Sequence, residues 1–232
     1  AGGFFGMRRF LVGVFFLACG IALLPFCAAS TWAAASLVGS LSPDSIFALP
    51  ASAWTLLSGF LLWLVIYFAL PRPIRTYVLA HELTHALWAS LMGAQVRRIT
   101  LAKEGGSVVL SKSNILITLA PYFFPLYTVI VIIVHALLSL FYDTSDYEWV
   151  WLFLIGLTWA FHLTFTVSAL LEHQTDILEY GRVFSLAFIY LINILEVGAW
   201  VVVVTPVRWE AFGLLLLQDS LTVWTWMFGL FF

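Results

Sequence analysis

Charged side chains are scarce in this sequence. Lys, Arg, Asp and Glu together make up 9% of its 232 residues, whereas soluble domains contain about 25%. The basic residues form no long run and the formal net charge is −2, which argues against nucleic acid as a partner. Apolar residues make up 63% of the chain, and the mean hydropathy is +1.05. The composition therefore predicts an α-helical polytopic membrane protein surrounded by the lipid bilayer.

Cysteine is also scarce, with two residues in the chain. Cys19 and Cys27 both lie in the first apolar segment. On one helix their Cα atoms would be about 12 Å apart along the axis, because each residue rises about 1.5 Å. That separation exceeds the reach of a disulfide. We therefore expect two free thiols.

Six apolar segments have the length of a transmembrane helix. They cover residues 10–29, 54–70, 74–93, 113–141, 149–171 and 181–205. Residues 212–232 are a candidate seventh, although Gln218 and Asp219 interrupt them, so they either span the bilayer or lie in its interface. Residues 30–52, which contain Pro43 and Pro50, are expected to form a surface loop.

The beginning of the chain is interpreted separately. Residues 1–6 have the form of a cloning remnant, because the sequence starts without Met and Met7 is followed by two arginines, as at a natural start. Residues 1–232 are otherwise expected to form a single integral membrane domain. We expect a multi-pass integral membrane protein, which would lie in the cell membrane if the source is bacterial.

The third apolar segment contains the sequence HELTH, from His81 to His85. Helical i, i+4 spacing places both imidazoles on one face, where they can share a zinc ion while Glu82 acts on a metal-bound water. Ionisable groups are costly to bury in hydrocarbon, so three within five residues indicate a functional site. The alternative is that two buried histidines and an acid are merely satisfied by hydrogen bonds in a helical bundle.

A segment of different character follows. Residues 95–112 contain β-favouring residues on both sides of Gly105-Gly106, which predicts a membrane-associated β-hairpin. An edge strand of such a hairpin can pair with an extended peptide, although a simple surface hairpin is an equal alternative. The candidate substrate-binding residues are Gly105, Gly106, Ser107 and Val108, together with Asn114 of the next helix.

These features resemble the site-2 protease family of intramembrane zinc metalloproteases. The segment HELTHALWASLMG at residues 81–93 carries the specific part, and the Gly-bearing hairpin and the following Asn- and Pro-containing helix extend the resemblance to residues 74–195. The resemblance implies that His81 and His85 bind zinc, that Glu82 is the catalytic base and that the hairpin engages the substrate. It implies a transmembrane or membrane-anchored protein substrate, cut in or near its transmembrane segment.

The third zinc ligand departs from the family's Leu-Asp-Gly pattern, which does not occur here. Asp176 is the candidate, because it lies at an expected helix start before an apolar span, as the family's Asp does. His173 and Glu172 share a helical face with Asp176 if this stretch is helical, so either is an alternative. His162 is the remaining alternative, although about 21 Å of continuous helix would separate it from Asp176. It fits better as a residue that supports a metal ligand by hydrogen bonding or relays a proton.

Two other classes of function remain open at this point. A membrane transporter would also place histidines and acids inside a helical bundle, but it would often show internal repeats, and none is found. An inactive protease-like scaffold that binds transmembrane segments would be expected to lack an intact HELTH sequence. The sequence therefore predicts a zinc-dependent intramembrane endopeptidase.

Overall fold

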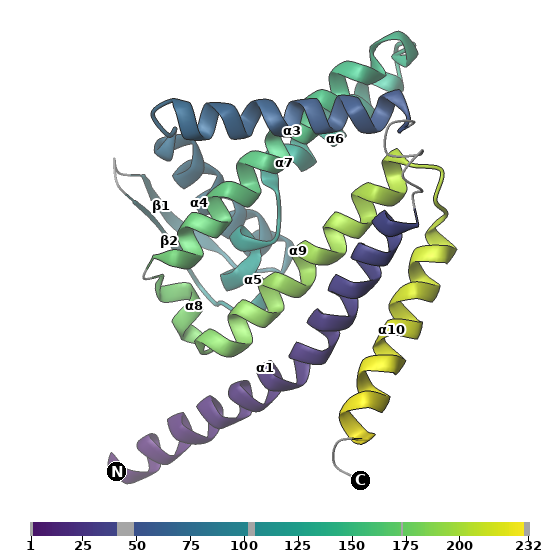
Figure 1. Cartoon of the computed structure of the whole chain (residues 1–232). Helices are drawn as coiled ribbons and strands as arrows, with labels where there is room; N and C mark the ends of the chain where they lie inside the picture. Colours follow the sequence, from purple (N-terminus) through teal and green to yellow (C-terminus); the bar gives the residue numbers. More distant parts are fainter. Residues whose placement is uncertain (1, 41–48, 102–104, 173, 230–232) are drawn as a thin grey trace. The chain divides into compact units, whose positions relative to one another are not determined.

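The computed structural model describes residues 2–40, 49–101, 105–172 and 174–229, which are mainly helical (Figure 1). The chain divides into two compact units. Ala51–Gln174 forms the unit that contains HELTH and is called the HELTH unit. Ala1–Pro50 and Thr175–Phe232 together form the other, called the terminal unit.

Three helices of the HELTH unit match expected apolar segments. Helix α3 (Ala51–Ala69) ends just before the Pro71-Arg72-Pro73 sequence, because neither proline can donate a backbone hydrogen bond to a continuing helix. Helix α4 (Ile74–Leu91) starts directly after that sequence, and helix α7 (Glu148–Leu171) completes the set. The prediction of helices in these three segments is confirmed.

Helices α3 and α7 pack closely through two glycines. A Cβ atom on Gly59 would overlap the carbonyl oxygen of Phe153, and one on Gly156 would overlap that of Leu56. Small residues at such an interface let two helix backbones approach within membranes, where van der Waals packing drives helix association. Beside this contact, Trp63 donates a hydrogen bond from Nε1 to Thr164 Oγ1 over 2.9 Å.

The glycine contact yields a prediction about stability. Gly59→Ala should lower the stability of the detergent-solubilised protein by about 1–3 kcal/mol, because its new methyl group forces α3 away from α7. A reduced midpoint of thermal unfolding measures this effect. Gly213→Ala is the matched control, because a Cβ at Gly213 has nothing within 4 Å. Equal midpoints for the two variants would show that the close approach of α3 and α7 contributes nothing.

The predicted β-hairpin is present in the HELTH unit. Strand β1 (Val96–Leu101) pairs in antiparallel fashion with β2 (Gly106–Leu110), with Ile99 opposite Val108 and Leu101 opposite Gly106. The expected turn includes residues 102–104, which lie outside the described residues. Paired residues share a face of a sheet, so Gly106, Val108, Ile99 and Leu101 all point to the same side.

The segment 113–141 was expected to be one helix, and this was wrong. The chain forms α5 (Ile115–Leu119), a 3₁₀ turn η1 (Ala120–Tyr122) and α6 (Leu126–Ser139), with an 85° bend between Ile115–Tyr122 and Leu126–Ser139. Pro121 and Pro125 cause the break, because neither can supply the N–H that a continuous helix requires. Such a bent pair is either a broken span or a re-entrant loop.

The terminal unit contains four helices in its described residues. Helix α1 (Gly2–Gly39) packs against α9 (Arg182–Val204) and α10 (Trp209–Gly229), and the short α8 (Thr175–Glu179) precedes α9. The expected loop at 30–52 is wrong at both ends, because α1 continues to Gly39 and α3 begins at Ala51. Residues 41–48 of that loop lie outside the described part. The Ala-rich sequence of residues 28–35 favours the longer helix.

Both cysteines lie on α1 and are free thiols, as expected. Cys27 is buried and donates a hydrogen bond from Sγ to the carbonyl oxygen of Ala187 over 3.3 Å. Cys19 is partly buried. The thiol of Cys27 therefore helps to join α1 to α9.

Four helices in the described residues are long and apolar enough to cross a membrane. They are Phe10–Gly39, Ala51–Ala69, Ser145–Leu171 and Arg182–Val204, and the bent pair α5–α6 makes a fifth if it counts as one span. Helix α4 is not among them, because its HELTH sequence and Arg75 lower its hydropathy, and α10 is not among them either. The helices indicate a membrane protein, whereas the expected count of six or seven spans is not confirmed.

Candidate metal centre

Helix α4 presents the HELTH histidines together. The ring centroids of His81 and His85 are 4.9 Å apart, as the i, i+4 spacing predicts. Glu82 lies on a neighbouring face and is 6% exposed. The opposite side of α4 carries an exposed apolar stripe at i, i+4 spacing, formed by Leu79, Leu83, Leu87 and Leu91. The helix therefore presents its two histidines on a different side from these exposed leucines.

The ring of His85 is held in one tautomer. Its Nδ1 lies 2.8 Å from the backbone carbonyl oxygen of Ile117, in α5. A carbonyl oxygen can only accept a hydrogen bond, so Nδ1 carries a proton and Nε2 is the ring nitrogen suited to bind a metal. Metal-binding histidines commonly donate their second N–H to such an acceptor, which orients the ring. His85 is therefore arranged to bind a metal through Nε2.

The carbonyl that orients His85 is available because of Pro121. In an α-helix the carbonyl of residue 117 would accept from the N–H of residue 121. Proline has no N–H, so that acceptor must find another partner. Ile117 is 1% exposed and far from solvent, and His85 supplies the donor. Reasoning from the sequence missed Ile117, although a proline four positions later is a signal that could have identified it.

His81 contacts an aromatic residue one turn earlier on α4. Its Nδ1 lies 3.3 Å from Tyr77 Oη, and the two rings meet edge to face. Tyr77 in turn stacks on Phe165 of α7, with ring centroids 4.7 Å apart and planes 6° apart. Tyr77 was not among the expected site residues, but its i−4 position relative to His81 is the sequence signal for it. The stacking holds the phenol of Tyr77 beside the ring of His81.

Strand β2 passes directly over the carboxyl group of Glu82. A Cβ atom on Gly106 would lie 2.5 Å from Cγ and 2.6 Å from Oε1 of Glu82. Real Cβ contacts are longer, so a side chain at position 106 would require the Glu82 carboxyl group or the hairpin to shift. A Cβ on the preceding Gly105 would have nothing within 4 Å. Of the two hairpin glycines, Gly106 is therefore the one that lies against the carboxyl group of Glu82.

The other expected substrate-binding residues have varied surroundings. Ser107 is exposed and Val108 is half-buried in β2. Asn114 caps α5, because its Oδ1 accepts from the backbone N–H of Ile117 over 3.0 Å, and its Nδ2 lies 3.1 Å from Met92 Sδ. This gives Asn114 a structural function, and its contact with a substrate stays a prediction.

The alternative ligands are also placed along the chain. Glu172 is the exposed C-cap residue of α7. His173 lies outside the described residues. His162 lies on α7, and its buried Nε2 atom has no hydrogen-bond partner among the described residues.

The described residues contain one candidate metal-binding group, formed by His81, His85 and Asp176. Each offers one possible ligand atom, an imidazole nitrogen or a carboxylate oxygen. Asp176 is in the first turn of α8, two residues beyond Gln174, where the HELTH unit ends. Two imidazoles and one carboxylate are a donor set that suits zinc.

Comparisons of the chain with protein-family models, curated proteins and solved structures found no match.

Proposed function

We propose that this chain is an intramembrane zinc metalloprotease that hydrolyses a peptide bond in or near the transmembrane segment of a membrane-protein substrate. The observation that carries the proposal is the arrangement of HELTH on α4, where His81 and His85 lie side by side and the His85 proton is held on Nδ1. The resemblance of residues 74–195 to site-2 proteases supports the same conclusion.

The donor chemistry of this chain fits zinc. His85 is oriented to bind through Nε2, and His81 and Asp176 complete the proposed set of ligands. When bound, zinc would lower the pKa of a coordinated water to about 7 and polarise the scissile carbonyl group. Three protein ligands leave a fourth position open, as catalytic rather than structural zinc sites require.

Glu82 is proposed as the general base. Its carboxylate accepts a proton as the oxygen of water bonds to the carbonyl carbon of the substrate. The same proton then passes to the nitrogen of the leaving amine as the carbon–nitrogen bond breaks. The carboxyl group is buried and lies against Gly106, so its position is restricted during both transfers.

The hairpin is proposed to hold the substrate in an extended form. A transmembrane helix hides its amide groups in internal hydrogen bonds, so it must unwind before a peptide bond can be cut. Strand β2 contacts α4, and in the described residues the sheet has two strands, so its edges offer backbone groups for strand addition. Ile99 and Leu101 are 40% and 50% exposed on the Gly106 side and offer an apolar surface beside Glu82.

Metal analysis of purified protein tests this proposal. We expect about one zinc ion per chain, and its loss in both His85→Ala and Asp176→Ala, because each variant removes a ligand. Elemental analysis after removal of loosely bound metal gives the ratio directly.

His135→Ala is a matched control, because His135 lies on α6 and its Nε2 pairs with Thr144 Oγ1. It should keep wild-type zinc. Absence of zinc from active wild-type protein would refute the metalloprotease, and would leave a transporter or a scaffold as the better explanation. If His85→Ala loses zinc but Asp176→Ala keeps the wild-type zinc content, the third ligand is His173 instead of Asp176.

A further inference from the structure

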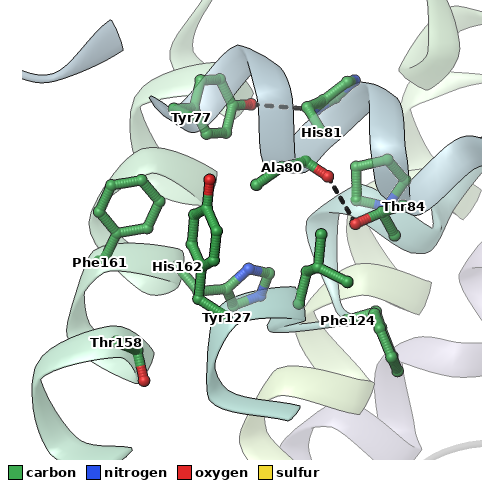
Figure 2. A pocket seen from close by; sticks show the side chains of 11 residues that line it. Tyr77, Ala80, His81, Thr84, Phe124, Tyr127, Thr158, Phe161 and His162 are labelled. Carbon is green, nitrogen blue, oxygen red and sulfur yellow. Dashed lines mark hydrogen bonds between the residues drawn. The ribbon is translucent and has the colours of Figure 1, made fainter. Parts of the chain in front are cut away.

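A small cavity lies behind the HELTH histidines, inside the HELTH unit. Its wall is formed by α4, by the bend between η1 and α6, and by α7 (Figure 2). The volume open to water-sized molecules is about 20 Å³. A cavity of roughly 10–15 Å³ on this measure is enough to hold one water, provided that polar groups surround it. The cavity is therefore large enough for a single water molecule.

The polar groups of this cavity come from all of its walls. His81 and Thr84 line it from α4, Tyr127 from α6, and Thr158 and His162 from α7. Figure 2 shows the imidazole of His162 beside the phenol of Tyr127, with Thr84 and His81 on the α4 side. The remaining lining is mainly aromatic and aliphatic, so these polar groups are the ones available to hold a water there.

Most hydroxyl groups around the cavity already donate to backbone carbonyls. Thr84 Oγ1 donates to Ala80 over 2.7 Å, and Tyr127 Oη donates to Thr76 over 2.9 Å. Each hydroxyl oxygen keeps lone pairs that can accept a further hydrogen bond. His162 differs, because its buried Nε2 has no partner in the part of the chain that the structure describes. A buried polar nitrogen left without a partner is destabilising, and a bound water would remove that cost.

We propose that His162 binds a water molecule in this cavity, and that the bound water is held ready for the hydrolytic site beside it. A water can donate to or accept from Nε2 and also bond to the hydroxyl oxygens of Thr84 or Tyr127, which gives it the two or more partners that buried waters require. Hydrolysis consumes one water per bond cut, and the site lies among membrane helices, where water is scarce. His162 is thus a positioning residue for the water that reaches His81.

This inference rests on the proposed hydrolysis, but its direct test does not. A high-resolution crystal structure of the full chain, prepared without metal, should show an ordered water at about 2.7–3.2 Å from His162 Nε2. The same cavity should lose that water in His162→Leu. A dry cavity in the wild-type protein would overturn the inference and would leave the zinc assignment untouched.

Kinetics of the zinc-loaded protein provide the second readout. In His162→Leu we expect kcat to fall by about 10- to 100-fold, as for other residues that support a metal site, with unchanged KM and zinc content. His162→Gln should recover most of kcat, because its amide reaches the position of Nε2. His162→Asn should not, because its amide reaches only the position of Nδ1.

The outcomes separate the two proposals. If kcat falls in His162→Leu and His162→Asn but recovers in His162→Gln, the hydrogen bond of His162 Nε2 to the water is supported. Equal loss in all three variants, or loss of zinc from any of them, would instead give His162 a packing or ligand function and overturn the inference. A wild-type protein that binds no zinc and cuts no substrate contradicts the proposed function, whatever the crystal structure shows in the cavity.

Discussion

Glu82→Gln should keep about one zinc ion per chain and lower the cleavage of a membrane-anchored substrate by about 10²- to 10⁴-fold, the usual contribution of general acid–base catalysis. The amide has nearly the shape of the carboxyl group, so the close contact with Gly106 is preserved. It cannot accept the proton of the attacking water at neutral pH. Parallel measurements of zinc content and of product formation test both halves of this expectation.

Glu148→Gln provides the control for this substitution. Glu148 begins α7 and is exposed, so the same chemical change there touches neither the histidines nor the hairpin. It should leave both zinc content and cleavage at wild-type levels. Cleavage by Glu82→Gln at the wild-type rate would refute the assignment of Glu82 as the base, and loss of its zinc would mean that Glu82 is a ligand.

Gly106→Ala should lower kcat by about 10²-fold without removing zinc. Its new methyl group would lie within 2.6 Å of Glu82 Oε1, so the carboxyl group must move by about 1 Å or the hairpin must shift. Misplacement of a catalytic group by about 1 Å is sufficient for a loss of this size. Steady-state kinetics with a membrane-anchored substrate, together with metal analysis, measure the effect.

The neighbouring glycine offers a matched control for this second variant. Gly105→Ala introduces the same methyl group one position earlier in the hairpin, where nothing lies within 4 Å. Its kcat should stay near the wild-type value. Equal losses in both variants would show that general disturbance of the hairpin, rather than displacement of Glu82, limits catalysis.

Local patterns predicted much of the HELTH unit. Helix α4 and the hairpin were predicted with nearly their final bounds, because i, i+4 spacing and paired β-favouring residues are properties of neighbouring positions. The shared face of His81 and His85 followed from the same spacing. The burial of Glu82 under Gly106 could not be predicted, because it depends on how β2 packs against α4.

The errors have a common physical origin. Hydropathy identified 113–141 as one apolar stretch but carries no information about direction, so the 85° bend was missed although this helix was described as Pro-containing. The prediction of a loop at residues 30–52 relied on Pro43 and Pro50. It overlooked the helix propensity of the Ala-rich residues before them. The expected span count is not confirmed at α4, where the HELTH residues reduce the hydropathy.

Pro121 has a consequence for sequence variation. Its contribution to the site is a missing atom, the amide hydrogen, and every other amino acid carries that hydrogen. Whatever its side chain, a substitution at this position supplies Ile117 with a backbone donor that competes with His85 for the same carbonyl oxygen. Chemical similarity between side chains is therefore no guide to tolerance at position 121, and conservative replacements have no advantage there.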